Sequence, residues 1–341
     1  MRVAVDNEPA VKETYSANHS GTHLIVADVR DVRGHQLLAK VPGGKLHVLA
    51  GCAPCQGFSS LTHKQKREDP RNELVLEMAR LVEETNPEIV VMENVPGLAL
   101  QGRPLLDEFI RRLRAHGYYA NWGILQMADF GVPQNRRRLV LAAGKGFFVA
   151  LPQPTHARIP VGQMRSWISV REAIGQFRAP SKLSEACRVG GPQSVNWHVV
   201  RDLKPITRER LKAAIPGKTW KSVSEELRPK CHRGGYDGFT NVYQRMTWEQ
   251  LSVTVTGGCT VPAKGRFGHP DRRRTTISVR EAATLQTFPK KYRFVTDHID
   301  KVCDMIGNAV PPTFGEHLGK RIAEALRQHR NDIEGAVPQH L

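Results

Sequence analysis

The pattern of apolar residues in the first 150 positions is the feature that most restricts the fold of this chain. Short apolar runs, of the length of a strand, alternate with stretches in which apolar residues recur every three or four positions, as on one face of a helix. Strands and helices that alternate in this way are typical of α/β proteins with a parallel sheet. We therefore predict an α/β domain over residues 1–150, with strands near residues 3–5, 24–27, 46–50, 89–92, 119–126 and 139–143.

Beyond residue 150 the periodicity weakens, and glycine, proline and basic residues become frequent. Residues 168–173 and 277–282 each place a serine three positions before a glutamate, the capping box that opens a helix. A last helix is predicted over residues 320–328, where it would return to pack on the first domain. We divide this part of the chain into a region over residues 185–265 and a C-terminal segment over residues 266–330.

The chain carries a large excess of positive charge. Its 50 lysines and arginines against 33 aspartates and glutamates give a formal net charge of +17 at pH 7. Residues 185–280 hold 18 of the basic residues and 8 of the acidic ones, a local excess of +10. Such an excess favours a polyanionic partner, most often nucleic acid, and we expect this basic part of the chain to bind it.

Three features argue against an exported or membrane-bound protein. No apolar run approaches the roughly 18–20 residues that span a bilayer. The first residues lack the basic and then apolar layout of a signal peptide. Six cysteines in 341 residues do not form the dense pattern of a disulfide framework, so we expect reduced thiols. These features predict a cytoplasmic protein without membrane contact.

Acidic side chains follow the first two predicted strands, at the place where ligands of open parallel sheets bind. Glu8 has the position of a carboxylate that commonly binds ribose hydroxyls in nucleotide-binding sheets. Asp28, at the end of the next strand, could accept a hydrogen bond from an adenine amino group. Each residue alone also fits an ordinary loop acid, and their regular placement is what favours a nucleotide-like ligand.

Cys55 directly follows Pro54 at the end of a predicted strand, in a turn that the proline makes rigid. A thiol held in this way suits a nucleophile, because the thiolate is the reactive form. Two alternatives also use Cys52: half of a zinc site, or a redox pair. The other four cysteines stand alone, so we expect no metal site. A redox pair leaves the basic region unexplained, which favours the nucleophile.

Glu93 ends a strongly apolar strand, where loss of hydration would raise the pKa of its carboxyl group. Such a group can donate a proton near neutral pH and is a candidate general acid. Arg136 and Arg138 lead into a later strand and share one of its faces, since alternate residues of a strand point the same way. Their guanidinium groups could bind a phosphate or polarise a base. A solvated cationic edge is the alternative for these arginines.

Five short motifs occur along the chain in an order that resembles the DNA (cytosine-5)-methyltransferases. They are Pro54-Cys55-Gln56, Glu93-Asn94-Val95, Gln134-x-Arg136-x-Arg138, the stretch from Arg280 to Pro289, and the stretch from Ile306 to Pro312. The resemblance covers most of the chain, from Val3 to Leu326. It implies a Rossmann-like methyltransferase sheet and a smaller, mixed target-recognition domain, for which residues 185–265 are the candidate.

The resemblance also implies a role for each matching residue in the methylation of cytosine at carbon 5. Cys55 would attack carbon 6 of a cytosine flipped out of duplex DNA, and Glu93 would protonate or hydrogen-bond ring nitrogen 3. Arg136 and Arg138 would hold the base and the activated loop. The methyl group would come from S-adenosylmethionine, the cofactor that the family uses.

The cofactor site implied by the resemblance uses the strand ends and two of the motifs. Glu8 would bind the ribose, Asp28 and Val29 the adenine, and Pro54 and Asn308 would lie near the cofactor. The partner would be double-stranded DNA, bound by a monomer at the nucleoid of a bacterium, in a restriction-modification system or as a solitary enzyme. A relative that acts on transfer RNA shares the chemistry, but the large recognition region favours DNA.

The chain departs from the family pattern at one place. The family normally opens with a strand and a glycine-rich loop, Asp-Leu-Phe-x-Gly-x-Gly-Gly, whereas this chain starts at the next element. We therefore expect a sheet without its N-terminal strand. A start placed too late, a split enzyme with the missing piece on another polypeptide, and a non-catalytic DNA-binding remnant are the three explanations, and we favour the first. The 341 residues alone are expected to bind S-adenosylmethionine poorly and to methylate weakly or not at all.

Overall fold

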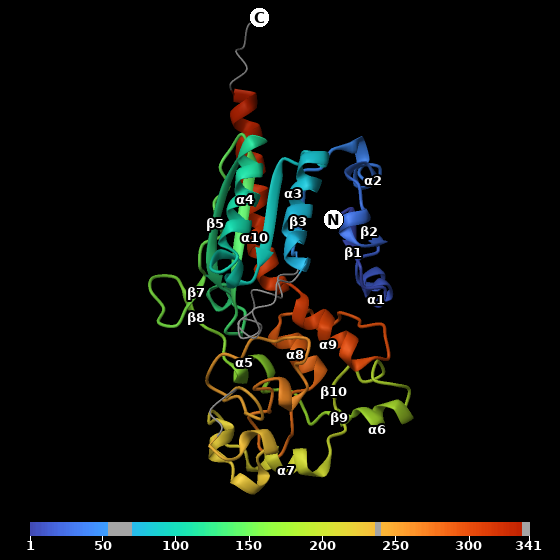
Figure 1. Ribbon diagram of the computed structural model, residues 1–341, viewed down its shortest axis with the longest axis vertical. Coiled ribbons are helices and arrows are strands. Elements are labelled where there is room, and N and C mark those ends of the chain that lie inside the picture. The colour runs from blue at the N-terminus through green and yellow to red at the C-terminus, as the bar shows by residue number, and fades with distance from the viewer. Residues whose placement is uncertain (54–69, 236–239, 336–341) are drawn as a thin grey trace, which may run out of the picture.

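The protein has two bodies stacked end to end (Figure 1). The computed structural model describes residues 1–53, 70–235 and 240–335. The upper body contains the strands and helices from the first part of the chain, and the lower body contains short elements from its middle. The last helix, α10 (Pro312–Gly335), runs from the lower body along the upper one.

The main sheet of the upper body has four strands in the order β3-β4-β6-β5. They are β3 (Val48–Gly51), β4 (Ile89–Asn94), β5 (Tyr118–Gln126) and β6 (Arg137–Lys145). β3 and β4 are parallel, but β6 is antiparallel to both β4 and β5. The predicted parallel sheet is therefore wrong at this edge. β6 follows β5 without a crossover helix, and such a connection returns the chain in the opposite direction.

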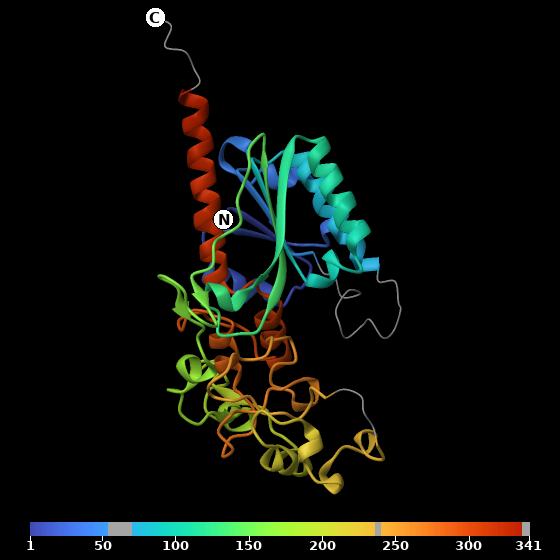
Figure 2. The same ribbon diagram turned by 90° about the vertical axis from the view of Figure 1, so that its left-hand side faces the viewer.

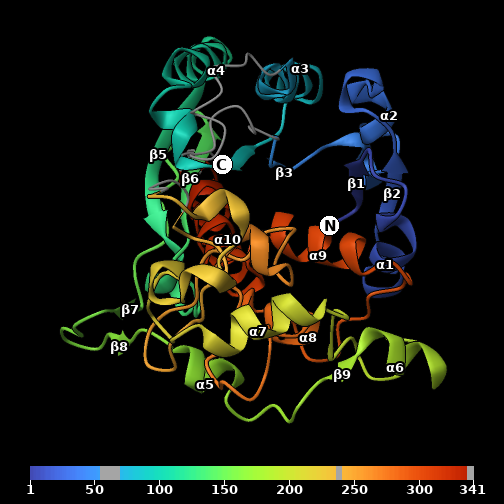
Figure 3. The ribbon, with the colours of Figure 1, turned by 60° about the horizontal axis from the view of Figure 1, so that its bottom comes forward.

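A second, two-stranded parallel sheet is formed by β1 (Val3–Asp6) and β2 (His23–Val26), which α1 (Val11–Asn18) connects. β1 and β3 do not pair, so the described strands of the upper body form two separate sheets. Figure 3 shows β1 and β2 set apart from β3. Every residue of β4 is buried, whereas those of β1 and β2 are half-buried or exposed.

Helices cover both faces of the main sheet (Figure 2). On one face, α3 (Leu74–Thr85) packs between α4 (Arg103–Ala115) and the short α2 (Gly34–Leu38). Their apolar residues recur every three or four positions, so each helix turns one apolar stripe toward the strands. The core on this face includes Val75, Met78, Val90, Leu106, Phe109 and Leu141.

The other face of the main sheet is covered by α10. Its residues Phe314 and Leu318 are buried with Val91 and Val140 of the strands. The helix predicted over residues 320–328 is thus part of a longer one, and its predicted packing on the first domain is confirmed. Neither α10 nor any other helix in the described part of the chain is both long and apolar enough to cross a membrane.

The lower body is built from short elements around its own apolar core. Its helices are α5 (Val170–Ile174), α6 (Leu183–Arg188), α7 (Pro205–Ala213), α8 (Val279–Leu285) and α9 (Ile299–Asn308). One short parallel strand pair, β9 (Ser181–Lys182) with β10 (Val199–Val200), accompanies them. A second short pair, β7 (His156–Ala157) with β8 (Arg165–Ser166), lies beside the 3-10 turn Met127–Phe130, which follows β5. The core extends from Val170 to Ile306, beyond both limits of the predicted recognition region. The division of the chain at residues 150, 185 and 265 stays a prediction.

Both predicted capping boxes open helices of the lower body. The Ser169 hydroxyl accepts a hydrogen bond from the backbone N–H of Glu172 at the start of α5, and Ser278 does the same for Glu281 at the start of α8. Each glutamate carboxylate in return accepts a bond of 2.7 Å from the backbone N–H of its serine. These reciprocal bonds confirm the two predicted helix starts.

Candidate active site

Glu93 lies at the carboxyl end of β4, with Arg138 of β6 beside it. In the antiparallel register Glu93 pairs with Val140, so Arg138, two residues before Val140, lies on the same face of the sheet as Glu93. The Arg138 Nε atom is 3.0 Å from the Glu93 Oε1 atom, and both side chains are nearly buried. The reversed direction of β6 is therefore what brings these two predicted site residues together.

The surroundings of Glu93 change its acidity. Burial raises the pKa of the Glu93 carboxyl group, and the positive charges of Arg138 and Arg136 oppose this effect. Burial also lowers the pKa of Arg138. Within the described part of the chain, Glu93 Oε1 has no hydrogen bond of good geometry, although Arg138 is close to it. A buried carboxyl group with an unsatisfied oxygen is suited to exchange a proton or a hydrogen bond with a ligand.

The carboxyl end of β3 lies next to that of β4. Gly51 pairs with Met92, and the Asn94 side chain donates a hydrogen bond of 3.0 Å to the Ala53 carbonyl oxygen. Asn94 therefore ties Ala53, two residues after β3, to the end of β4. Pro54 and Cys55, the predicted turn and nucleophile, lie outside the described residues. Ala53 directly precedes Pro54, and this bond joins it to Asn94, the residue after Glu93 in the sequence.

Arg136 lies just before β6 and is only 2% exposed. Its guanidinium group donates hydrogen bonds to the carbonyl oxygens of Val255, at 3.1 Å, and of Gly307 and Ala309, each at 3.3 Å. Burial, followed by the charge of Arg138, lowers the pKa of Arg136 to about 9. The two arginines thus have different partners, because Arg138 contacts Glu93 and Arg136 joins β6 to the end of α9. A role of Arg136 toward the base stays a prediction.

Two fully buried glutamines complete this junction between the bodies. The Gln134 side chain donates a hydrogen bond of 2.7 Å to the Gln286 side-chain oxygen and accepts one of 2.8 Å from the backbone N–H of Val255. Gln286 in turn donates to the Ala309 carbonyl oxygen at 2.6 Å. Buried amides must satisfy their donors and acceptors, so these bonds fix the segments they join. Neither glutamine had a predicted role, because no local sequence pattern pairs residues 152 positions apart.

Asn308, a predicted cofactor residue, is the exposed last residue of α9. The preceding Gly307 packs so closely on the lower body that a Cβ atom there would lie 2.3 Å from the Gly257 nitrogen and the Thr256 carbonyl carbon. Only glycine permits this approach. The motif therefore needs its glycine for packing, while the asparagine beside it remains accessible to a ligand.

Glu8 follows β1 and is joined to α9 by a salt bridge. Its Oε2 atom lies 2.7 Å from the Lys301 Nζ atom, and its Oε1 atom accepts a hydrogen bond from the backbone N–H of Ala10. The bond with Lys301 lowers the pKa of the Glu8 carboxyl group, which is therefore ionised at neutral pH. The helix that ends at Asn308 thus also contacts the predicted ribose-binding carboxylate.

Asp28 follows β2, the strand that pairs with β1, so Asp28 and Glu8 lie at the same edge of the small sheet. The Asp28 carboxylate accepts hydrogen bonds of 2.6 and 3.0 Å from the Arg30 side chain and one of 2.9 Å from the Arg30 backbone N–H. These bonds lower the pKa of Asp28 to about 2. Val29 begins the 3-10 turn Val29–Asp31 and packs against the core under α3. The pairing of Asp28 with Arg30 was not among the predictions from the sequence.

The residues at this edge fit the adenosine part of S-adenosylmethionine. Ribose hydroxyls and an adenine amino group need hydrogen-bond acceptors, and Glu8 and Asp28 are two ionised carboxylates at neighbouring strand ends. Their side chains remain 40% and 28% exposed, so a ligand can reach them. A ligand there would share the two carboxylates with Lys301 and Arg30.

A cavity of about 500 Å³ lies at the other end of the main sheet. It is bounded by residues before β3 and β4 and by the ends of β6 and α10, among them Lys45, His47, Glu88, Lys145, Phe147 and Arg330. Lys45 and Arg330 form ion pairs with Glu88. Because ligands of such sheets bind at the carboxyl ends of the strands, this cavity is separate from the site around Glu93.

Solved structures share this fold. A protein described as a DNA modification methyltransferase encoded within a prophage of E. coli aligns with a TM-score of 0.71 over 96% of this chain and 93% of its own, at 19% identity. The Dnmt2 methyltransferase of S. pombe aligns with a TM-score of 0.56 over 96% and 91%, also at 19% identity. The fold is that of the α/β methyltransferases, and the predicted fold class is confirmed.

Sequence comparison gives the family. The profile described as C-5 cytosine-specific DNA methylase matches residues 1–324. The chain is 35% identical to the Type II methylase M.HgiDII of Herpetosiphon aurantiacus, over 94% of this chain and 88% of that protein. It is 32% identical to the Type II methyltransferase M1.HphI of Haemophilus parahaemolyticus, over 97% and 82%. The chain therefore belongs to the C-5 cytosine-specific DNA methylase family, and the resemblance carried by the motifs is confirmed.

Proposed function

We propose that this chain transfers a methyl group from S-adenosylmethionine to carbon 5 of cytosine within a specific sequence of duplex DNA. Membership of the family supports this reaction class. One geometric observation supports the site: the buried ion pair of Glu93 and Arg138 lies at the end of β4, where Asn94 holds the residue that precedes Pro54-Cys55. Cys55, the proposed nucleophile, follows Ala53 by two positions in the chain, and Glu93, the proposed general acid, directly precedes Asn94.

The proposed chemistry begins on the cytosine ring with Cys55 and Glu93. The Cys55 thiolate forms a bond to carbon 6, and the electron pair of the double bond shifts onto carbon 5 and the rest of the ring. Protonated Glu93 donates to ring nitrogen 3 and stabilises this electron density, a role that its raised pKa favours. After carbon 5 is methylated, loss of its proton restores the ring double bond and releases the thiolate.

The two arginines have separate roles in this proposal. Arg138 orients the Glu93 carboxyl group from 3.0 Å away and contacts the flipped base. Arg136 is bonded to the carbonyl oxygens of Val255, Gly307 and Ala309, and so holds the junction of β6 with the lower body in place under the base and the activated loop. A base-binding pocket supported by these hydrogen bonds would keep its geometry when DNA binds.

S-adenosylmethionine would supply the methyl group from a site at the ends of β1 and β2. Glu8 would bind its ribose hydroxyls, Asp28 and Val29 its adenine, and Pro54 and Asn308 would lie near it. The shared edge of Glu8 and Asp28, and the contact of Glu8 with α9, support this assignment.

The lower body, through residues 185–265, would recognise the DNA. A base inside a stack cannot be reached, so the target cytosine must flip out at a cost of a few kcal/mol. Phosphate contacts from the basic residues would supply affinity, and contacts in the grooves would supply sequence. Relatives with Type II names support a restriction-modification role for a monomeric enzyme in the bacterial cytoplasm, at the nucleoid.

We also propose that full activity requires an additional N-terminal piece that contributes one strand and a glycine-rich loop. β1 pairs only with β2, and β3 only with β4, so each has one free strand edge in the described part of the chain. A parallel strand between them would join the two sheets into one and bury the half-exposed apolar residues of β1. The loop after that strand would approach the methionine end of the cofactor.

Transfer of tritiated methyl groups to unmethylated DNA tests both proposals. We expect little transfer and weak S-adenosylmethionine binding by the 341-residue chain, and strong transfer once an N-terminal piece with the additional strand and the glycine-rich loop is supplied. DNA binding without transfer by the completed protein would instead identify a non-catalytic remnant. Transfer to transfer RNA in preference to DNA would overturn the assigned substrate, and micromolar binding of the cofactor by the chain alone would overturn the need for the piece.

A further inference from the structure

The buried side chain of Arg245 holds the inner side of a short loop over residues 268–276, in the C-terminal segment. The loop leaves and rejoins an antiparallel bridge between Gly268 and Thr276, and His269 N–H donates a hydrogen bond of 3.0 Å to the Thr275 carbonyl oxygen. A Cβ atom at Gly268 would lie 2.7 Å from the Gln244 carbonyl oxygen, so the base of the loop is tightly packed. The loop tip consists of Asp271, Arg272 and Arg273.

Arg245 organises this loop from the inside. It is 2% exposed, and its guanidinium group donates to the carbonyl oxygens of Leu211 at 2.8 Å and His269 at 2.6 Å. It also reaches three more carbonyl oxygens at longer distances, those of Asp271, Arg272 and Thr275. A buried charge is costly unless hydrogen bonds satisfy it, so the loop backbone must keep these oxygens turned inward. The shape of the loop is thereby fixed.

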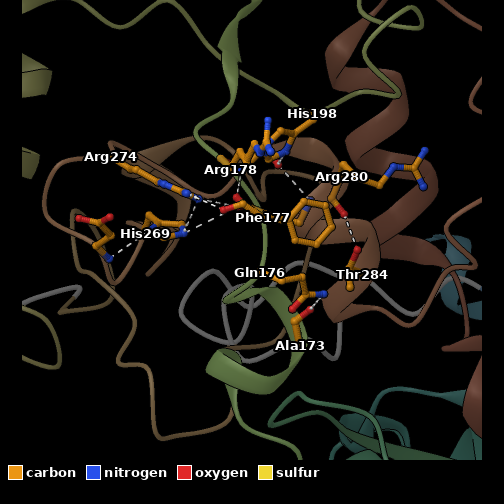
Figure 4. Close-up of polar contacts among 12 residues, drawn as sticks. Ala173, Gln176, Phe177, Arg178, His198, His269, Arg274, Arg280 and Thr284 are labelled. Carbon is orange, nitrogen blue, oxygen red and sulfur yellow. Dashed lines mark hydrogen bonds and ion pairs between the residues drawn. The ribbon is translucent and has the colours of Figure 1, made fainter.

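The half-buried Arg274 anchors the end of the loop through an ion pair with the buried Glu281. The Arg274 guanidinium lies 3.1 Å from Glu281 Oε1 and donates a bond of 2.6 Å to the Phe177 carbonyl oxygen. Figure 4 shows Arg274 between His269 and Phe177, which belong to different parts of the lower body. The loop is therefore attached to α8, through Glu281, and to the segment that follows α5.

Beyond these inward contacts, the two arginines at the tip are exposed. The Arg273 side chain is 90% exposed, and Asp271 holds it by a bond of 2.8 Å. Arg272 is exposed and donates to the Lys212 carbonyl oxygen at the end of α7, so the tip lies against that helix. Together, α7 and residues 271–273 contain five arginines and lysines against two acidic residues. The surface formed by α7 and the loop tip is strongly cationic.

We propose that Arg245 is a positioning residue that presents Arg272 and Arg273 to phosphate groups of duplex DNA. This inference rests on the proposed function and extends the DNA-binding surface beyond residue 265, into the segment that sequence analysis assigned to the return of the chain. Guanidinium groups bind phosphate oxygens in fixed, bidentate geometries, so a rigid loop suits this task better than mobile side chains. The buried hydrogen bonds of Arg245 hold the loop backbone, and the exposed Arg272 and Arg273 are thereby kept in one geometry for phosphate binding.

The salt dependence of DNA affinity tests this inference. Affinity of the full chain for a short mixed-sequence duplex is measured by fluorescence anisotropy between about 50 and 200 mM salt. Each lost phosphate contact lowers the slope of log affinity against log salt by about 0.9. For the double variant Arg272→Gln/Arg273→Gln we expect a slope smaller by about 1.8, so that the wild-type protein loses roughly twelvefold more affinity than the variant over this range.

A matched control removes the same charge from the upper body. Arg111→Gln/Arg114→Gln changes two exposed arginines of α4, one of them paired with an acid as Arg273 is. Its slope should equal that of the wild-type protein. If the control and the loop variant lower the slope equally, only general charge matters and the inference fails. If the wild-type protein binds DNA and the loop variant keeps its slope, the inference fails while DNA binding stands. Absence of DNA binding by the wild-type protein would overturn both.

The positioning role has its own variant. Arg245→Lys keeps the buried charge, but one ammonium group cannot reach the same set of carbonyl oxygens. We expect the reduced slope of the double variant although Arg272 and Arg273 are both present. A thermal melt checks that Arg245→Lys is folded. If it is not folded, the double variant Arg272→Gln/Arg273→Gln still tests whether the loop tip contacts DNA phosphates. A folded Arg245→Lys protein with the wild-type slope would show that Arg245 does not position the tip.

Discussion

The Nε atom of Arg138 lies 3.0 Å from the Oε1 atom of Glu93, and both side chains are nearly buried. Burial raises the pKa of Glu93, and Arg138 pulls it down, so two large opposing effects act on one carboxyl group. A group in this state can respond to a ligand that adds or removes a hydrogen bond. The pair therefore joins the fold, through the register of β4 and β6, to the proposed chemistry.

Replacement of Glu93 by glutamine should slow methyl transfer without loss of DNA binding. Glutamine keeps the shape and a hydrogen-bond donor but has no proton to transfer, and removal of a general acid costs about 10²- to 10⁴-fold in rate. Single-turnover transfer by the completed protein measures this effect, and anisotropy measures DNA binding. A Glu93→Gln enzyme as fast as the wild type would remove Glu93 from the mechanism.

Arg136 and Arg137 are neighbours in sequence that should differ sharply in their effect on stability. Arg136→Met leaves the carbonyl oxygens of Val255, Gly307 and Ala309 without their donor, which should lower the free energy of unfolding by about 2–4 kcal/mol. Arg137 is exposed, so Arg137→Met should change it by no more than about 0.5 kcal/mol. Urea unfolding compares the two, and equal losses would contradict the role of Arg136 as a brace.

Local sequence patterns were sufficient to predict those strands and helix starts that depend on residues close together in the sequence. The apolar runs predicted the positions of the strands, and the two serine–glutamate pairs predicted the starts of α5 and α8, because caps and periodicity act within a few residues. The direction of β6 was not predictable in this way. It depends on the connection after Gln126, which makes a 3-10 turn and returns, where a helix would have crossed over.

Candidate site residues could be chosen from sequence, but their partners could not. Glu93 was selected because it ends an apolar strand, and the structure adds the neighbour that sets its acidity. Arg136 and Arg138 look equivalent by strand alternation, yet one contacts Glu93 and the other braces α9. The difference arises because Arg136 precedes the strand and meets residues more than 100 positions away. Cys55 lies outside the described residues, so its role stays a prediction.

Two glycine-to-alanine changes should have opposite effects. At Gly307 the new Cβ atom would lie 2.3 Å from backbone atoms of Thr256 and Gly257, so we expect Gly307→Ala to destabilise the protein by about 1–3 kcal/mol or more. Gly315, within α10, has no atom within 4 Å of its Cβ position among the described residues, apart from its chain neighbours and the adjacent backbone of its own helix. Gly315→Ala should stabilise the helix by about 0.5–1 kcal/mol. Thermal unfolding of both proteins provides the comparison, and a neutral Gly307→Ala would show that the contact can relax.

The buried neighbours His269 and Glu281 should give opposing pH dependences of stability. Burial raises the pKa of Glu281 to about 7, from an ordinary 4.5, so the folded state holds this proton more tightly and stability falls as pH rises between these values. Burial lowers the pKa of His269 to about 4, from 6.5, so stability rises as pH rises over that window. In the wild-type protein the two contributions nearly cancel.

Removal of one partner should expose the other contribution. Glu281→Gln removes the carboxyl group whose titration lowers stability as pH rises. As pH rises from about 4.5 to 7, the free energy of unfolding of this variant should therefore gain ~3 kcal/mol relative to that of the wild type. Urea unfolding at a series of pH values measures this difference. Parallel curves for the two proteins would mean that Glu281 titrates equally in the folded and unfolded states.

Covalent trapping tests the central claim most directly. A duplex carrying 5-fluorocytosine at the target base cannot lose the group at carbon 5, so an enzyme that bonds through Cys55 remains attached. With the completed protein and S-adenosylmethionine we predict a complex that survives denaturing electrophoresis, with the crosslink mapped to Cys55 and absent from Cys55→Ser. Methylation of ordinary DNA by the same preparation, without any trapped adduct on the fluorinated duplex, would contradict the proposed covalent mechanism.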